Sequence, residues 1–210
     1  LPLALVDNIR SRDLSALGGQ EHVISVLFAD LRGFTRFSEA LEPEQVMRTL
    51  NRYLSAATGA IDLYEGVIDK FLGDGILASF GAVAPSATAA ADALRAADDV
   101  LDAADRWGAE RRAAGLPPLS VGLAVASGRV VFGAVGDGER LEFTVIGDAV
   151  NFAAKLEKHN KDEKTRALAD ARTYLLAEQQ GYVAPLPRER RTGQRVAGVS
   201  EPVDIVVLAK

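Results

Sequence analysis

Two aspartates give the clearest chemical signal in this sequence. Asp30 lies in Phe28-Ala-Asp-Leu-Arg-Gly-Phe-Thr35, and Asp74 lies in Lys70-Phe-Leu-Gly-Asp-Gly-Ile76. Each carboxylate ends an apolar run beside a glycine, the arrangement expected where a strand stops and the backbone can approach a phosphate-bound metal closely. The two turns together predict one nucleotide site.

Each of these turns also has a simpler interpretation. Asp30 could cap a helix that begins near Gly33, and Asp74 could only form a hairpin turn. The backbone N–H groups from Leu31 to Thr35 lead into a helix N-terminus, where they can bind phosphate oxygens, but the segment could also be an ordinary loop. Each aspartate alone favours the simpler interpretation, whereas the pair favours a metal site.

Composition limits the chemistry that can surround this pair. The 210 residues, 48% of them apolar, are enough for one globular domain with a complete core. A formal net charge of -5 argues against nucleic-acid binding, because that needs clustered Lys and Arg. The chain has no cysteine and only two histidines, which excludes thiolate chemistry and argues against a His-based metal cluster or triad. Carboxylates, Lys and Arg therefore remain as the side chains available for chemistry.

No apolar run approaches the length of about 18 residues that suggests a membrane span, and no signal peptide is visible. We therefore expect a cytoplasmic domain without membrane contact. The chain opens at Leu1 without an initiator Met, which suggests a piece of a longer polypeptide whose missing N-terminal module could be a membrane anchor or a sensor. Residues 1–20 are expected to be a connector or coupling segment, and residues 21–210 the domain.

The elements that must position the aspartates follow from hydrophobic periodicity. Strands are expected at residues 22–29, 66–71, 76–80, 119–126, 130–135, 141–145, 165–168, 182–186, 195–199 and 203–208. Helices are expected at residues 35–64 (two helices, the second begun by Pro43), 87–112, 148–158 and 169–178. The first strand should end at Asp30, and turns are expected at residues 127–129 and 137–138. Helices interleaved with hairpins predict an α+β sandwich with a mainly antiparallel sheet, not a doubly wound parallel sheet.

Four motifs in order resemble the class III adenylyl/guanylyl cyclase catalytic domain. They are Val26-Leu-Phe-Ala-Asp-Leu-Arg-Gly-Phe-Thr35, Lys70-Phe-Leu-Gly-Asp74, Ser127-Gly-Arg129 and Thr144-Val-Ile-Gly-Asp-Ala-Val-Asn151. The resemblance implies a ferredoxin-like βαββαβ core with additional C-terminal strands and helices, and a head-to-tail homodimer with nucleotide sites at its interface. The implied reaction converts ATP to 3′,5′-cyclic AMP and pyrophosphate in intracellular signal transduction.

The resemblance assigns the metal and phosphate contacts. Asp30 and Asp74, together with Leu31, match the metal-binding positions, which implies two divalent cations, Mg²⁺ or Mn²⁺. The phosphate-binding segment comprises Leu31, Gly33, Phe34 and Thr35. One ion would lower the pKa of the ribose hydroxyl, and the other would steady the leaving pyrophosphate.

The resemblance also assigns the contacts to base, ribose and triphosphate. Lys70 matches the lysine that reads adenine and Thr144 its partner, which suggests ATP over GTP; the alternative is a solubilising Lys and a β-favouring Thr. Asn151 matches the asparagine that orients the ribose, and Arg129 an arginine that contacts the triphosphate. Their alternatives are a helix cap and an exposed turn charge.

The sequence departs from the family pattern at two places. Lys155 stands where the family usually has an arginine that stabilises the transition state, so the charge remains but the planar fork of donors is lost. Val199 stands where the family often has a second triphosphate-binding lysine, and the alternatives for its substitute are Arg195 and a residue outside the motifs. Both departures predict slow catalysis.

Two other functions therefore remain open. A catalytically weak or inactive domain could bind nucleotide or dimerise and regulate an attached domain, and a non-nucleotide interaction domain could use the same scaffold. A diguanylate cyclase is disfavoured, because its Gly-Gly-Asp/Glu-Glu-Phe turn is absent.

Overall fold

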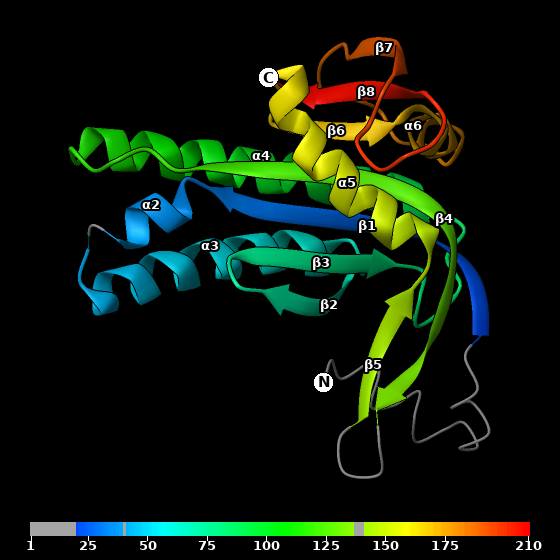
Figure 1. Ribbon diagram of the computed structural model, residues 1–210, viewed down its shortest axis with the longest axis horizontal. Helices are drawn as coiled ribbons and strands as arrows, with labels where there is room; N and C mark the ends of the chain where they lie inside the picture. The colour runs from blue at the N-terminus through cyan, green and yellow to red at the C-terminus, as the bar shows by residue number, and fades with distance from the viewer. Residues whose placement is uncertain (1–19, 40, 137–140) are drawn as a thin grey trace.

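The protein is described by a computed structural model that covers residues 20–39, 41–136 and 141–210 (Figure 1). The elements in chain order are β1 (Gln20–Arg32), α2 (Phe34–Ser38), α3 (Pro43–Leu63), β2 (Val67–Leu72), β3 (Gly75–Phe80), α4 (Ala89–Ala113), β4 (Ser120–Gly136), β5 (Leu141–Ile146), α5 (Asp148–Glu163), β6 (Ala167–Asp170), α6 (Ala171–Gln179), β7 (Glu189–Gln194) and β8 (Val203–Ala209). The expected connector falls almost wholly on residues 1–19, which lie outside the described residues.

The sheet confirms the predicted fold class. Its strand order is β2-β3-β1-β4-β6-β8-β7. The remaining strand, β5, is not part of this order and pairs with β4. β1 pairs antiparallel with both β3 and β4, so that β1, α3, β2, β3, α4 and β4 form the expected ferredoxin-like βαββαβ unit. The only parallel pair among the described strands joins β4 to β6.

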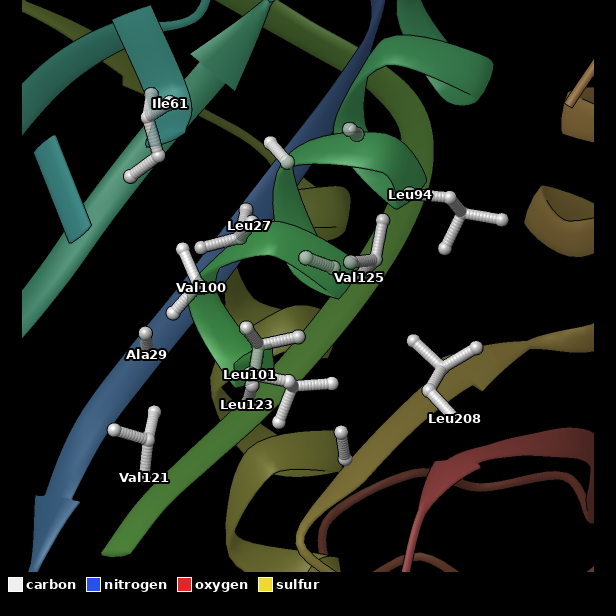
Figure 2. Close-up of a cluster of buried hydrophobic side chains, with 14 of the residues drawn as sticks. Leu27, Ala29, Ile61, Leu94, Val100, Leu101, Val121, Leu123, Val125 and Leu208 are labelled. Atoms are coloured by element: carbon white, nitrogen blue, oxygen red, sulfur yellow. The ribbon is translucent and has the colours of Figure 1, made fainter. Parts of the chain in front are cut away.

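The two faces of the sheet have separate cores, because side chains alternate along each strand. On one face, Leu27 and Ala29 of β1 pack with β4 and with the alanine-rich helix α4, as Figure 2 shows. On the other face, Val26 of β1 packs with Ala149 and Ala153 of α5. Asp30 follows the alternation of Val26 and therefore belongs to the α5 face.

The local predictions near the aspartates hold, with one difference. Pro43 begins α3, and β2 and β3 form the expected hairpin around Gly73 and Asp74. The prediction that β1 ends at Asp30 was wrong, because its pairing with β4 continues to Arg32 opposite Ser120. Asp30 is therefore a strand residue.

The predicted turn at residues 127–129 was also wrong. β4 is one continuous strand, since Ser127 pairs with Ser25 and Arg129 with Val23 of β1. Long-range pairing overrides the turn preference of the Ser-Gly pair. The predicted turn at residues 137–138 lies outside the described residues.

The C-terminal part differs most from the predictions. Residues 182–186 and 195–199 form no strand; instead β7 spans the polar residues Glu189–Gln194. β7 is the last strand of the sheet and is mostly exposed, so its pairing with β8 depends on backbone bonds and leaves no apolar pattern to find. α5 runs to Glu163, beyond the predicted end at residue 158, while β6 and α6 each begin two residues later than predicted.

β4 and β5 extend beyond the body of the domain as a two-stranded arm (Figure 1). Val131, Val135 and Ile146 are 46%, 49% and 55% exposed on this arm. No described helix is both long enough and apolar enough to cross a membrane.

Candidate active site

Asp30 and Asp74 come together where β1 meets the β2–β3 hairpin. Ala29 pairs with Ile76, which places Asp30 beside the turn. Gly73 has a φ of 68°, a left-handed conformation that glycine adopts without steric cost, and it turns the chain so that Asp74 faces β1. The Asp30 Oδ1 atom lies 3.6 Å from the position that a side-chain carbon on Gly75 would occupy. The two carboxylates predicted to bind metal therefore form one pair.

The charge of this pair is unfavourable without a cation. Burial raises the pKa of Asp30, and the neighbouring Asp74 carboxylate raises it further. The Leu31 N–H opposes this shift by donating a hydrogen bond of 3.1 Å to Asp30 Oδ1. Within the described residues, no three His, Asp or Glu side chains gather as a metal site. Two carboxylates alone suit Mg²⁺ or Mn²⁺, which usually take their remaining ligands from water and substrate phosphates.

Arg32 and Glu157 form a second charged group next to the carboxylate pair, on the same face of the sheet. Arg32 donates a hydrogen bond of 2.8 Å to the Thr165 carbonyl, and its guanidinium lies 3.9 Å from the Glu157 carboxylate. Gly122, the cross-strand partner of Asp30, leaves the space for Arg32 and Glu157, since a side-chain carbon there would overlap Glu157 Oε1. Burial raises the pKa of Glu157, and the Asp30 charge raises it further. The sequence prediction missed both residues.

The predicted phosphate-binding segment comes directly after Asp30 in the chain. Gly33 has a φ of 80° and turns the chain from β1 into α2, which begins at Phe34. The Leu31 side chain is buried, so only its backbone can reach an ion or a phosphate, and its N–H already bonds Asp30. The N-cap residue of α2 is Gly33, and no side chain accepts a capping hydrogen bond from this helix. The alternative that Asp30 caps the helix is therefore wrong.

Lys70 and Thr144 are brought together by a residue that the sequence prediction missed. Asp69, whose side chain is only 4% exposed, accepts a hydrogen bond of 2.9 Å from the Thr144 hydroxyl at Oδ2. The Lys70 ammonium lies 3.7 Å from the same oxygen. The predicted base-reading pair thus gathers around one buried carboxylate, although the two residues lie on separate strands.

Arg129, Asn151 and Lys155 line a hollow of about 600 Å³ between the middle of β4, helix α5 and the loop before β8. The Asn151 side chain is exposed, and Gly147 is the N-cap of α5, so the alternative that Asn151 caps this helix is wrong. The Lys155 ammonium donates a hydrogen bond to the Gly198 carbonyl.

One positively charged side chain that lines the hollow is not part of the four motifs. Arg172, in the first turn of α6, lines it beside Val199, and its side chain is 86% exposed. Arg195, considered above as a substitute for the lysine missing at Val199, is not among the lining residues. Arg129 is mostly exposed and pairs with Glu21 at 3.2 Å.

The hollow and the carboxylate pair are different places on one chain. Neither Asp30 nor Asp74 is among the described residues that line the hollow. Arg129 pairs with Val23, seven positions along β1 from Asp30, which corresponds to about 23 Å along the strand. The structure therefore does not bring Arg129 to the carboxylate pair of its own chain.

Comparisons with known proteins identify the family of this chain. The family model of the adenylate and guanylate cyclase catalytic domain matches residues 19–188. A protein described as an adenylate cyclase from Anabaena cylindrica is 43% identical over 138 residues, which are 64% of this chain and 26% of that protein. The chain spans about 26% to 30% of the length of the curated relatives it matches.

Solved structures give the same family. The guanylyl cyclase Cya2 is 32% identical with a TM-score of 0.78, over 90% of this chain and 93% of that chain. The adenylyl cyclase CyaB from P. aeruginosa is 29% identical with a TM-score of 0.80, over 92% of this chain and 97% of that chain. These relatives include both adenylyl and guanylyl cyclases.

Proposed function

Because the chain belongs to the adenylate and guanylate cyclase catalytic domain family, we propose that it is an adenylyl cyclase that acts in signal transduction. In the proposed reaction, the ribose 3′-oxygen of ATP attacks the α-phosphorus and forms a new bond to it. The bond from the α-phosphorus to the bridging oxygen breaks, pyrophosphate leaves, and the hydroxyl proton passes to solvent. The products are 3′,5′-cyclic AMP and pyrophosphate.

The observation that carries this proposal is the contact between Asp30 and Asp74. Residues far apart in sequence bring two carboxylates together, where burial and the neighbouring Asp74 charge raise the pKa of Asp30. Such a pair gains most when divalent cations bind. Two ions, Mg²⁺ or Mn²⁺, would neutralise the triphosphate and lower the pKa of the ribose hydroxyl. Asp30 and Asp74 would hold them with their side chains, and Leu31 could add only its backbone carbonyl.

Lys70 and Thr144 support ATP as the substrate. Both side chains gather at Asp69, close enough to one another to contact a single purine. The backbone from Gly33 to Thr35 would contact phosphate oxygens, as the resemblance predicts. ATP as substrate also fits a cytoplasmic location, which we propose for this domain.

The residues of the hollow would supply the contacts to the ribose and to the reacting phosphates. Asn151 would orient the ribose, and Lys155 would offset the negative charge that develops on the pentavalent phosphorus. Arg129 and Arg172 add positive charge to the same hollow and would contact the triphosphate. Arg172 would thereby take the place of the lysine that Val199 replaces.

A head-to-tail homodimer would join the two halves. Reacting atoms must lie roughly 3 to 3.5 Å apart, so the carboxylate pair and the hollow must contact the same nucleotide. Their separation within one chain favours a site in which one protomer supplies the metals and its partner supplies the hollow and the base contacts. The exposed apolar residues of the arm, Val131, Val135 and Ile146, offer a surface for such an interface.

One observation favours a second candidate function. The Lys155 ammonium already bonds the Gly198 carbonyl, which reduces its capacity to stabilise a transition state. A domain of this kind could bind nucleotide and dimerise without significant turnover, and regulate an attached module.

A direct assay separates the two functions. Purified protein with Mn²⁺ and ATP should form cyclic AMP, whereas Asp30→Ala should not. Asp62→Ala, which changes an exposed aspartate of α3, is the matched control and should retain activity. If the unmodified protein forms no more product than Asp30→Ala, the cyclase proposal is wrong. Binding of a fluorescent ATP analogue would then support the regulatory domain, and its absence a non-nucleotide interaction domain.

A further inference from the structure

Asp69 occupies an irregular position in β2. Ile68 pairs with Ala78 and Lys70 with Leu77, so Asp69 is the extra residue of a β-bulge. In a regular strand, neighbouring side chains point to opposite faces of the sheet, but a bulge changes the direction of its side chains. The bulge allows Asp69 and Lys70 to lie on the same side, where their charged groups are 3.7 Å apart.

Two donors from β5 bind the two oxygens of Asp69. The Thr144 hydroxyl donates to Oδ2 at 2.9 Å, and the Val145 backbone N–H donates to Oδ1 at 3.1 Å. Both partners of the hydroxyl bond are shielded from solvent, since Thr144 is 8% exposed and the Asp69 side chain 4%. An ionised carboxylate can only accept hydrogen bonds, so the direction of the Thr144 bond is fixed.

This direction determines what Thr144 can offer to a base. A threonine hydroxyl has one proton, and here Asp69 takes it. The remaining lone pairs of the hydroxyl oxygen can only accept. Adenine carries an amino group, a donor, at the position where guanine carries a carbonyl oxygen, an acceptor. Thr144 in this state therefore matches adenine and opposes guanine.

We propose that Asp69 sets the preference for ATP over GTP by fixing the Thr144 hydroxyl as an acceptor and holding the Lys70 ammonium beside it. This inference rests on the proposed function and deepens it. Asp69 is a positioning residue, because it acts on the base through Thr144 and Lys70. Lys70 supplies the complementary donor, which a ring nitrogen of adenine can accept.

Asp69→Asn gives a sharp test, because it keeps the shape and changes the polarity. The buried Val145 N–H still needs an acceptor, so the amide oxygen should turn toward it. The amide NH₂ would then donate to Thr144, whose own proton becomes free to donate to a guanine carbonyl. We expect the ratio of kcat/KM for ATP to kcat/KM for GTP to fall by about tenfold or more. An unchanged ratio would overturn the proposal.

Two further variants separate positioning from folding. Thr144→Val removes the hydroxyl but leaves Asp69 its bond to Val145, and should also lower the ratio. Adding Asp69→Asn to Thr144→Val should change the ratio no further, because the two residues act through one bond. If Asp69→Asn does not fold, Thr144→Val alone decides, and a ratio equal to that of the unmodified protein contradicts the inference.

The test also distinguishes this inference from the proposed function. If the unmodified protein cyclises neither ATP nor GTP, the proposed function fails. If it cyclises ATP and the variants keep its ATP:GTP ratio, only the inference about Asp69 fails. Competition of ATP and GTP for a bound fluorescent ATP analogue measures the ratio of their binding affinities without turnover, and Asp69→Asn should lower this preference for ATP as well. Asp62→Asn on the exposed surface of α3 is the matched control.

Discussion

Lys155 donates a hydrogen bond to the backbone carbonyl of Gly198 and so joins the middle of α5 to the loop between β7 and β8. This contact places a positive charge in the hollow but takes up one of only three ammonium donors. An arginine at this position would offer five donors in a planar fork, enough to keep the carbonyl contact and also bind phosphate oxygens.

We expect Lys155→Arg to keep or raise kcat for ATP, because the guanidinium restores the missing donors. Lys155→Ala should lower kcat by about 10² to 10³, the usual effect of losing one preorganised donor to a transition state. Steady-state kinetics with Mn²⁺ and ATP measure both variants. A lower kcat for Lys155→Arg than for the unmodified protein would show that the lysine does not occupy the position of a transition-state donor.

Gly147 sets the position of α5 against β4. A side-chain carbon there would lie 2.7 Å from the Arg129 carbonyl oxygen and 2.9 Å from the Val130 Cα. Because backbone atoms cannot yield easily, we expect Gly147→Ala to destabilise the protein by about 1 to 3 kcal/mol and to displace Asn151 and Lys155. The temperature of thermal unfolding and kcat should both fall. Gly59→Ala is the matched control, since nothing lies within 4 Å of Gly59, and it should be neutral or slightly stabilising.

The metal-free protein should show the effect of Asp30 on its stability. Below the ordinary pKa of 3.8, Asp30 is protonated in both the folded and the unfolded chain and has no net effect. As the pH rises, the unfolded chain loses this proton first because the folded pKa is raised, so the free energy of unfolding decreases until the pH has passed the folded pKa. Asp30→Asn should therefore be the more stable protein at pH 7, by a margin that vanishes near pH 3.8.

Added Mn²⁺ should reverse this order at pH 7. The unmodified protein should gain thermal stability because the ion binds only the folded state, whereas Asp30→Asn should gain little. Thermal unfolding with and without the ion measures both effects. A higher stability of the metal-free unmodified protein at pH 7, or an equal response of both proteins to Mn²⁺, would contradict the assignment of Asp30 to metal binding.

Local chemistry explains which features the sequence could predict. Pro43 fixes its own φ, and Gly73 with Asp74 forms a tight turn, so both act within a few residues and were located correctly. The residues 127–129 also look like a turn, but pairing with β1 across the sheet decides their structure. Local preference cannot reveal a bond formed with a distant strand.

The same reason explains the residues that were missed. Asp69 bonds Thr144, which lies 75 positions away in the chain, and it faces Thr144 only because of an irregularity in β2. β7 has no apolar pattern because both faces of this edge strand are largely exposed. The roles of Lys70, Thr144 and Asn151 came from the family resemblance, and their types alone would not have indicated a site.

A mixing experiment with two inactive variants tests the shared site most directly. Asp30→Ala removes the metal half, and Asn151→Ala removes the half that orients the ribose. In a head-to-tail dimer of one chain of each kind, one site carries both changes and the other carries neither. An equal mixture should therefore regain about one quarter of the activity of the unmodified protein. No cyclic AMP above the level of the separate variants, with an active unmodified protein and confirmed exchange of protomers, would contradict the account.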